Sequence, residues 1–80
     1  MATKTIFSPL PGTFYRRPAP DALLFKNEGD LVSAGEPVGV IEVMKTFNHV
    51  IAEETGRIRR FLVENEEAVM AGEPLYELEV

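Results

Sequence analysis

Lys45 is the residue whose surroundings first suggest chemistry. The stretch VIEVMKTFNHV, residues 40–50, holds two runs that favour β-strand, and these runs meet at Met44-Lys45. A two-residue hairpin turn normally uses Asn-Gly or Asp-Gly, because its central residues need positive φ. Met and Lys tolerate that conformation poorly, and violations of local rules concentrate at functional sites. We therefore predict an exposed tip that presents the Lys45 amine; a merely solvated lysine on a hairpin is the alternative.

Few other residues are candidates for chemistry. The chain has one histidine, His49, and neither cysteine nor tryptophan. His49 has no evident partner for general-base catalysis, and the acidic residues near turns are best interpreted as solvated charges. The sequence contains none of the common metal-ligand, phosphate-loop or Ser-His-Asp patterns. We predict no catalytic residue, no metal site and a protein that is not itself an enzyme. An exposed lysine is a weak nucleophile, so a partner enzyme would have to modify Lys45.

Length and composition limit what can position this lysine. Eighty residues make one domain, residues 1–80, with 13 acidic against 8 basic residues and a net charge of −5. That charge argues against nucleic acid as a partner. No apolar run approaches the roughly 20 residues of a membrane span, and none resembles a signal peptide, so we expect a cytoplasmic protein. Glycines and prolines punctuate short apolar runs, which is typical of an all-β domain.

An internal repeat organises these runs. AGEP occurs at 34–37 and again at 71–74, and residues 29–43 match residues 66–80 at seven of fifteen positions. Upstream, Gly12 matches Gly56 at a longer offset, so the first copy carries seven extra residues, in or near 17–24. In each AGEP turn we expect a glycine with positive φ and a proline that starts a strand.

The repeat predicts a pseudo-two-fold domain in which Met44-Lys45 joins the two copies. The junction and the chain termini occupy equivalent positions in the two copies. Because a two-fold axis places equivalent positions at opposite ends, the hairpin should lie at the end of the domain opposite the termini. Val40 and Glu42 match Glu77 and Glu79, and we expect this phase to face water. The residues expected to face the core are the pairs Ile41/Leu78, Val43/Val80 and Phe14/Ile58.

With these features in place, the sequence resembles the biotinyl domain of biotin carboxyl carrier proteins of the acetyl-CoA carboxylase type, within the biotinyl/lipoyl family. The family signature Ala-Met-Lys-Met reads Val43-Met44-Lys45-Thr46 in this chain. The stretch SPLPGTFYRRPAPDA, residues 8–22, is similar to the part of the carrier that includes a protruding thumb. GRIRRFLVENEEAVMAGEPL, residues 56–75, is similar to its second half.

The resemblance implies a fold and a site. The implied fold is a flattened barrel or sandwich of two pseudo-two-fold-related four-stranded antiparallel sheets, with the modified lysine on a hairpin opposite the termini and a thumb within residues 17–24. The implied cofactor is biotin, covalently attached at Lys45, with Met44 as its hairpin neighbour. The thumb residues that we expect to cover or position biotin are Pro18, Ala19, Pro20, Asp21 and Ala22.

The implied function is carriage. A biotin protein ligase would attach biotin, biotin carboxylase would load a carboxyl group, and a carboxyltransferase would pass it on to acetyl-CoA for fatty-acid synthesis. Three alternatives stay open: the carrier of another biotin enzyme such as urea carboxylase, a lipoyl carrier, and an unmodified domain that serves only in assembly. Lipoyl tips resemble Asp-Lys-Ala, which Met44 and Thr46 do not match. The sequence leaves open the carboxyl acceptor, the oligomeric state and whether the carrier is free-standing.

Overall fold

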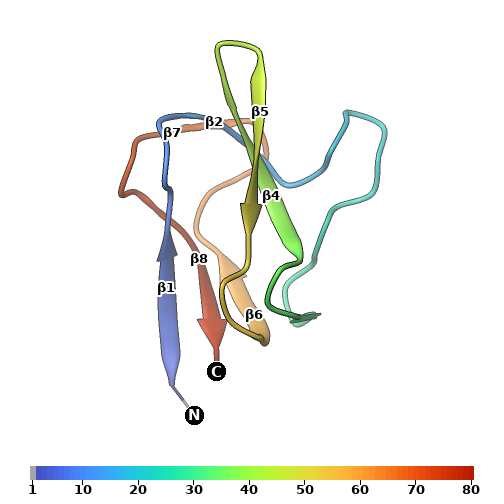
Figure 1. Cartoon of the computed structure of the whole chain (residues 1–80). Coiled ribbons are helices and arrows are strands. Elements are labelled where there is room, and N and C mark those ends of the chain that lie inside the picture. The colour runs from blue at the N-terminus through green and yellow to red at the C-terminus, as the bar shows by residue number, and fades with distance from the viewer. Residues whose placement is uncertain (1) are drawn as a thin grey trace.

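Eight β-strands form two four-stranded antiparallel sheets in the computed structural model, which describes residues 2–80 (Figure 1). The strands are β1 (Thr3–Phe7), β2 (Gly12–Tyr15), β3 (Leu31–Val32), β4 (Pro37–Val43), β5 (Thr46–Ile51), β6 (Gly56–Phe61), β7 (Glu67–Val69) and β8 (Pro74–Glu79). Sheet A has the order β1-β8-β6-β3, and sheet B has the order β5-β4-β2-β7. The predicted all-β fold is confirmed. Over residues 2–80 there is no helix able to cross a membrane.

The two sheet orders correspond strand by strand, as the repeat predicts. The strands β1, β8, β6 and β3 of sheet A take the places of β5, β4, β2 and β7 in sheet B. Gly12 and Gly56 occupy matching positions where a side chain would collide with a carbonyl of the neighbouring strand. The glycines of the two AGEP turns, Gly35 and Gly72, have φ of 96° and 83°, and the following prolines begin β4 and β8. These turn predictions are confirmed.

The glutamates of the AGEP turns have a structural role that the sequence did not reveal. The Ser33 N–H donates to Glu36 Oε1 at 2.6 Å, and the Met70 N–H donates to Glu73 Oε1 at 3.1 Å. Each carboxylate therefore closes its own four-residue turn. The hydrogen bond from the Ser33 N–H is the main cause that lowers the pKa of Glu36, and the hydrogen bond from Lys26 is the second.

The core lies between the sheets and is symmetric. Phe14, Ile58, Ile41 and Leu78 are all buried to within 1% exposure, so both of these predicted core pairs are confirmed. Val80 was predicted to face the core, and this prediction is wrong. It is 37% exposed, because it lies one residue beyond the end of β8.

Val40 also departs from the prediction that its phase faces water. It is 4% exposed, although it alternates with the fully buried Ile41 along β4. The loop after β2 folds over the outer face of sheet B: Phe25 makes an edge contact with His49, ring centroids 6.2 Å apart, and His49 pairs with Val40 across the strands. The loop that carries the inserted residues therefore covers Val40, whereas the matching Glu77 of the other repeat is 18% exposed and forms ion pairs.

The thumb, residues 17–24, projects sideways from the body between β2 and β3 (Figure 1). Its base is closed by the Phe25 N–H, which donates to Arg16 O at 2.9 Å. Its end is a tight turn in which the Ala22 N–H donates to Ala19 O at 3.0 Å. Because Pro18 also has a fixed φ, the thumb is a shaped loop with its own hydrogen bonds.

Candidate functional site

The Met44-Lys45 tip closes a two-residue hairpin between β4 and β5. Val43 pairs with Thr46, and the two turn residues have φ of 49° and 66°, as the primed hairpin turns require. Met44 is 94% exposed. Figure 1 shows this hairpin at one end of the molecule and both termini at the other. The predicted geometry of the tip, including its unfavourable backbone conformation, is confirmed.

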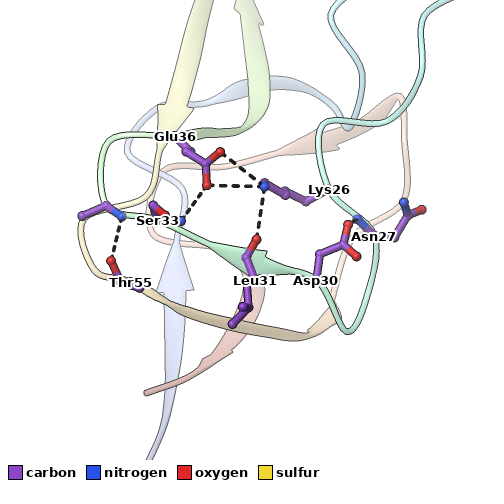
Figure 2. Close-up of polar contacts among 8 residues, drawn as sticks. Lys26, Asn27, Asp30, Leu31, Ser33, Glu36 and Thr55 are labelled. Carbon is purple, nitrogen blue, oxygen red and sulfur yellow. Dashed lines mark hydrogen bonds and ion pairs between the residues drawn. The ribbon is translucent and has the colours of Figure 1, made fainter.

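Lys45 differs from the other two lysines in the polar contacts that its amine makes with residues 2–80. Lys4 Nζ lies 2.6 Å from Glu54 Oε2. Lys26 Nζ donates to Leu31 O at 3.1 Å and lies 3.4 Å from the Glu36 carboxylate, as Figure 2 shows. The structure gives Lys45 Nζ neither a hydrogen bond nor an ion pair with residues 2–80. Lys45 is exposed at the tip, whereas the amines of Lys4 and Lys26 are paired.

A groove of about 470 Å³ lies between the thumb and the outer face of sheet B. Its apolar lining comes from the thumb and from β4 and β5, and its polar lining from β2, β4, the thumb and the β6–β7 loop. The apolar residues are Pro18, Ala19, Pro20, Val40 and Phe47, and the polar ones are Tyr15, Arg17, Glu42, Asn65 and Glu66.

One hydrogen bond spans the sheet side of this groove. The Tyr15 hydroxyl donates to Glu42 Oε1 at 2.9 Å, and this bond, with desolvation and the charges of Glu42 and Glu66, raises the pKa of Tyr15. Glu42 pairs across the strands with Phe47, which lies two residues after Lys45. At about 3.3 Å per strand residue, the groove therefore begins about 7 Å along the strand from the tip.

The predicted thumb residues divide into two groups. Pro18, Ala19 and Pro20 line the groove, whereas Asp21 and Ala22 do not. Asp21 is exposed, and Ala22 O accepts a hydrogen bond from Arg17 Nη1 at 3.3 Å. The structure thus brings the first three of the five predicted residues together with β4 and β5. Whether these residues contact biotin remains a prediction.

The groove meets the requirements of a small, fused ring system with a polar edge. Ligand sites are mostly apolar clefts of about 300–1,000 Å³ with a few placed polar groups, and this groove has both properties. A ureido ring has N–H donors and one carbonyl acceptor. Glu42 supplies acceptors from β4, and Arg17 supplies donors from the thumb. The residues present therefore fit biotin.

Asn48 is a further residue of the site that sequence reasoning missed. Its Nδ2 donates to Ile41 O and Thr46 O, both at 3.3 Å, so it braces the strands that carry the tip. A polar amide in the inward phase of β5 was the only available signal. His49 contacts Phe25 and shows no catalytic arrangement. Within residues 2–80, no group of His, Cys, Asp and Glu side chains is arranged to hold a metal ion.

Comparison with known proteins gives consistent results. A family model described as "Biotin-requiring enzyme" matches residues 4–78. The biotin carboxyl carrier proteins of acetyl-CoA carboxylase from Nostoc sp. and Porphyra purpurea are 41% and 43% identical to the chain over 88% and 94% of its length. The same carrier from Haemophilus influenzae is 38% identical over 90% of the chain. The chain spans 38–48% of the length of these relatives.

Two solved structures resemble the chain as well. A single-chain, multi-domain long-chain acyl-CoA carboxylase matches 94% of the chain with a TM-score of 0.79 and 27% identity. The urea carboxylase of Kluyveromyces lactis matches 99% of it with a TM-score of 0.78 and 29% identity. The chain corresponds to 7% and 6% of these two proteins.

Proposed function

The chain belongs to the biotin/lipoyl family of biotin-requiring enzymes, and from that premise we propose that it is a carboxyl carrier with biotin joined to Lys45. The observation that carries the proposal is the tip itself. Two adjacent residues hold a left-handed backbone, and the amine between the strands has no partner among residues 2–80, in contrast to Lys4 and Lys26. A conformation that disfavours folding is retained where it presents a reactive group.

Attachment requires a partner enzyme. A biotin protein ligase supplies biotin as its adenylate; Lys45 Nζ attacks the acyl carbon, AMP leaves, and the amine gives up a proton as the amide forms. The bound biotin supplies a ureido nitrogen that can take up and release a carboxyl group. The hairpin holds the attachment point away from the body of the domain, where an enzyme's active site can reach it.

The remaining residues serve the arm and the partners. Asn48 and the Val43–Thr46 pair fix the direction in which Lys45 leaves the hairpin. The groove beneath the tip gives the ring a resting place that Pro18, Val40 and Phe47 partly screen from water. Both termini lie opposite the tip (Figure 1), so a tether at that end would leave the tip free to keep the carboxyl group at high effective concentration between two active sites.

The partners in this proposal are a biotin carboxylase, which loads the carboxyl group, and a carboxyltransferase, which removes it. Acetyl-CoA is the proposed acceptor, because the relatives that the chain matches at about 40% identity are named as carriers of acetyl-CoA carboxylase. The carrier contributes no catalytic residue and works in the cytoplasm beside these enzymes. Urea carboxylase, to which the fold is also similar, makes a urea-specific carrier the second candidate.

Intact mass after co-expression with a biotin protein ligase tests the proposal. We expect a gain of about 226 Da, against about 188 Da for a lipoyl group, and we expect Lys45→Arg to abolish it. That substitution keeps the positive charge but removes the primary amine. Lys26→Arg is the matched control and should be modified normally. A biotin signal on Lys45→Arg, or no gain in the wild type, would contradict the assignment.

A further inference from the structure

Arg17 lines the groove with most of its hydrogen-bonding capacity unused. Its Nη1 donates to Ala22 O at 3.3 Å, and its Nε is buried without a partner among residues 2–80. None of the ion pairs within this part of the chain includes Arg17; they join Lys4 to Glu54, Lys26 to Glu36, and Arg59 and Arg60 to Glu77. A guanidinium has five N–H donors, so Arg17 is a cation that lacks a matching acceptor.

The neighbouring Arg16 has a different role. Its guanidinium carbon lies 3.9 Å from the centre of the Phe61 ring, and its Nη2 donates to Lys26 O at 3.5 Å. Its Nε is also without a partner among residues 2–80, but the stack on Phe61 holds the group against the body of the domain. Of the two adjacent arginines, only Arg17 lines the groove.

The residues that line the groove indicate which chemical group Arg17 would bind. A planar guanidinium is best satisfied by a carboxylate that accepts two parallel hydrogen bonds. Glu42 and Glu66 line the same groove, so the ligand must present a donor as well as an anion. Glu42 Oε1 already accepts the Tyr15 hydroxyl, which leaves its second oxygen for that donor.

We propose that Arg17 binds the carboxyl group in transit, with the ureido ring seated between the thumb and sheet B. This inference rests on the proposed function and extends it. A ureido ring with a carboxyl group on one nitrogen keeps an N–H on the other. It therefore offers a carboxylate to Arg17 of the thumb and a donor to Glu42 of β4, both of which line the groove. Arg17 is in this sense a positioning residue that retains the cargo between active sites.

The first test does not depend on biotin. The unloaded chain is titrated with N-carboxymethyl-2-imidazolidinone, a ureido ring with a stable carboxylate, and with the neutral N-methyl-2-imidazolidinone. We expect millimolar carboxylate to shift the Arg17 Nε–H resonance in an NMR spectrum and the neutral compound to leave it in place. The resonances of Arg59, an exposed arginine on sheet A, should not respond. Equal shifts with both compounds, or no shift with either, would overturn the proposal.

The second test uses the biotin-loaded chain. After loading by biotin carboxylase with labelled bicarbonate and removal of the enzyme and ATP, the half-life of the label on the carrier is measured. We expect Arg17→Gln to shorten it several-fold, Arg17→Lys to shorten it less, and Arg59→Gln to leave it unchanged. A half-life in Arg17→Gln equal to that in Arg59→Gln would overturn the proposal, provided that the amide spectra show both variants folded.

The two tests separate the inference from the function on which it rests. If the chain takes up no biotin, or takes up biotin but no carboxyl group, the proposed function fails while the titration still decides whether Arg17 recognises a ureido carboxylate. If the carrier loads normally and Arg17→Gln has no effect in either test, the function stands and the role of Arg17 is refuted.

Discussion

The two sheets share a fold and a core but present different outer faces. At matching positions of the repeat, Val40 on sheet B is 4% exposed, whereas Glu77 on sheet A forms ion pairs with Arg59 and Arg60. The outer face of sheet A is therefore charged at this position: the Glu77 side chain is 18% exposed, and those of Arg59 and Arg60 are 55% and 59% exposed. Sheet B has an apolar position beneath a loop, and beside it a groove.

The difference shows how a carrier site can be added to a symmetric scaffold. The seven extra residues of the first copy fall in the thumb, and the matching corner of the second copy closes without them. The insertion leaves the inward phase of the strands intact, because Ile41 and Leu78 remain equally buried. Core and site are therefore carried by opposite faces of the same strand.

The largest effect should come from the part that the two sheets share. Ile41→Ala and Leu78→Ala should each lower the free energy of unfolding by about 2–5 kcal/mol, because each removes a fully buried side chain. Urea denaturation followed by circular dichroism measures both. A loss within this range for one variant and outside it for the other would show that the two halves of the core are not equivalent, and would weaken the comparison between the sheets.

Exchanging the residues that differ should have unequal effects. Val40→Glu should lower the free energy of unfolding by about 1–3 kcal/mol, because it places a carboxylate without a partner in a buried position. Glu77→Val removes two ion pairs with exposed arginines and should lower it by about 1 kcal/mol or less. Thermal denaturation of the two variants gives the comparison; similar losses would show that Val40 is in practice as accessible as Glu77.

Removing the thumb should make the two faces alike. Deletion of residues 18–24 should leave a folded domain that still accepts biotin, at a loss of about 1 kcal/mol from the exposure of Val40, since loop length affects closure entropy only weakly. In the deletion variant, Val40→Glu should hardly change the free energy of unfolding. A double-mutant cycle measures this coupling between the thumb and position 40. Biotin mobility by NMR should increase. Failure to fold would show that the insertion is a structural element, and unchanged biotin mobility would leave it as a loop without a role at the site.

The smallest change in stability is expected at the tip. Met44→Leu should change the free energy of unfolding by less than about 0.5 kcal/mol, because Met44 is 94% exposed. Met44→Asn should raise it slightly, since Asn tolerates a left-handed backbone better than Met. Both variants should be biotinylated more slowly, as measured by the rate of streptavidin-reactive product. A marked loss of stability with normal biotinylation would assign Met44 a packing role instead.

Most of the fold could be predicted because the repeat encodes it twice. The AGEP turns, the buried pair Phe14/Ile58 and the exposed Met44-Lys45 tip all follow from comparing one copy with the other. Val40 could not be predicted in this way, because its burial depends on a loop that has no counterpart in the second copy. The Tyr15–Glu42 bond and the place of Arg17 in the groove escaped for the same reason: they depend on contacts between segments that no sequence period relates.

The pairing of the chain ends has a topological consequence. Ala2 and Val80 exchange two backbone hydrogen bonds, of 3.1 and 2.9 Å, at the positions that match Thr46 and Val43 in the repeat. A second hairpin at this point needs two residues between Val80 and Ala2, as Met44 and Lys45 lie between Val43 and Thr46. A two-residue linker would complete that hairpin and make the chain a ring, and the ring could then be opened at another turn without disturbing either sheet. A circular permutant of this kind would present lysine tips at both poles of the domain, if the linker were Met-Lys.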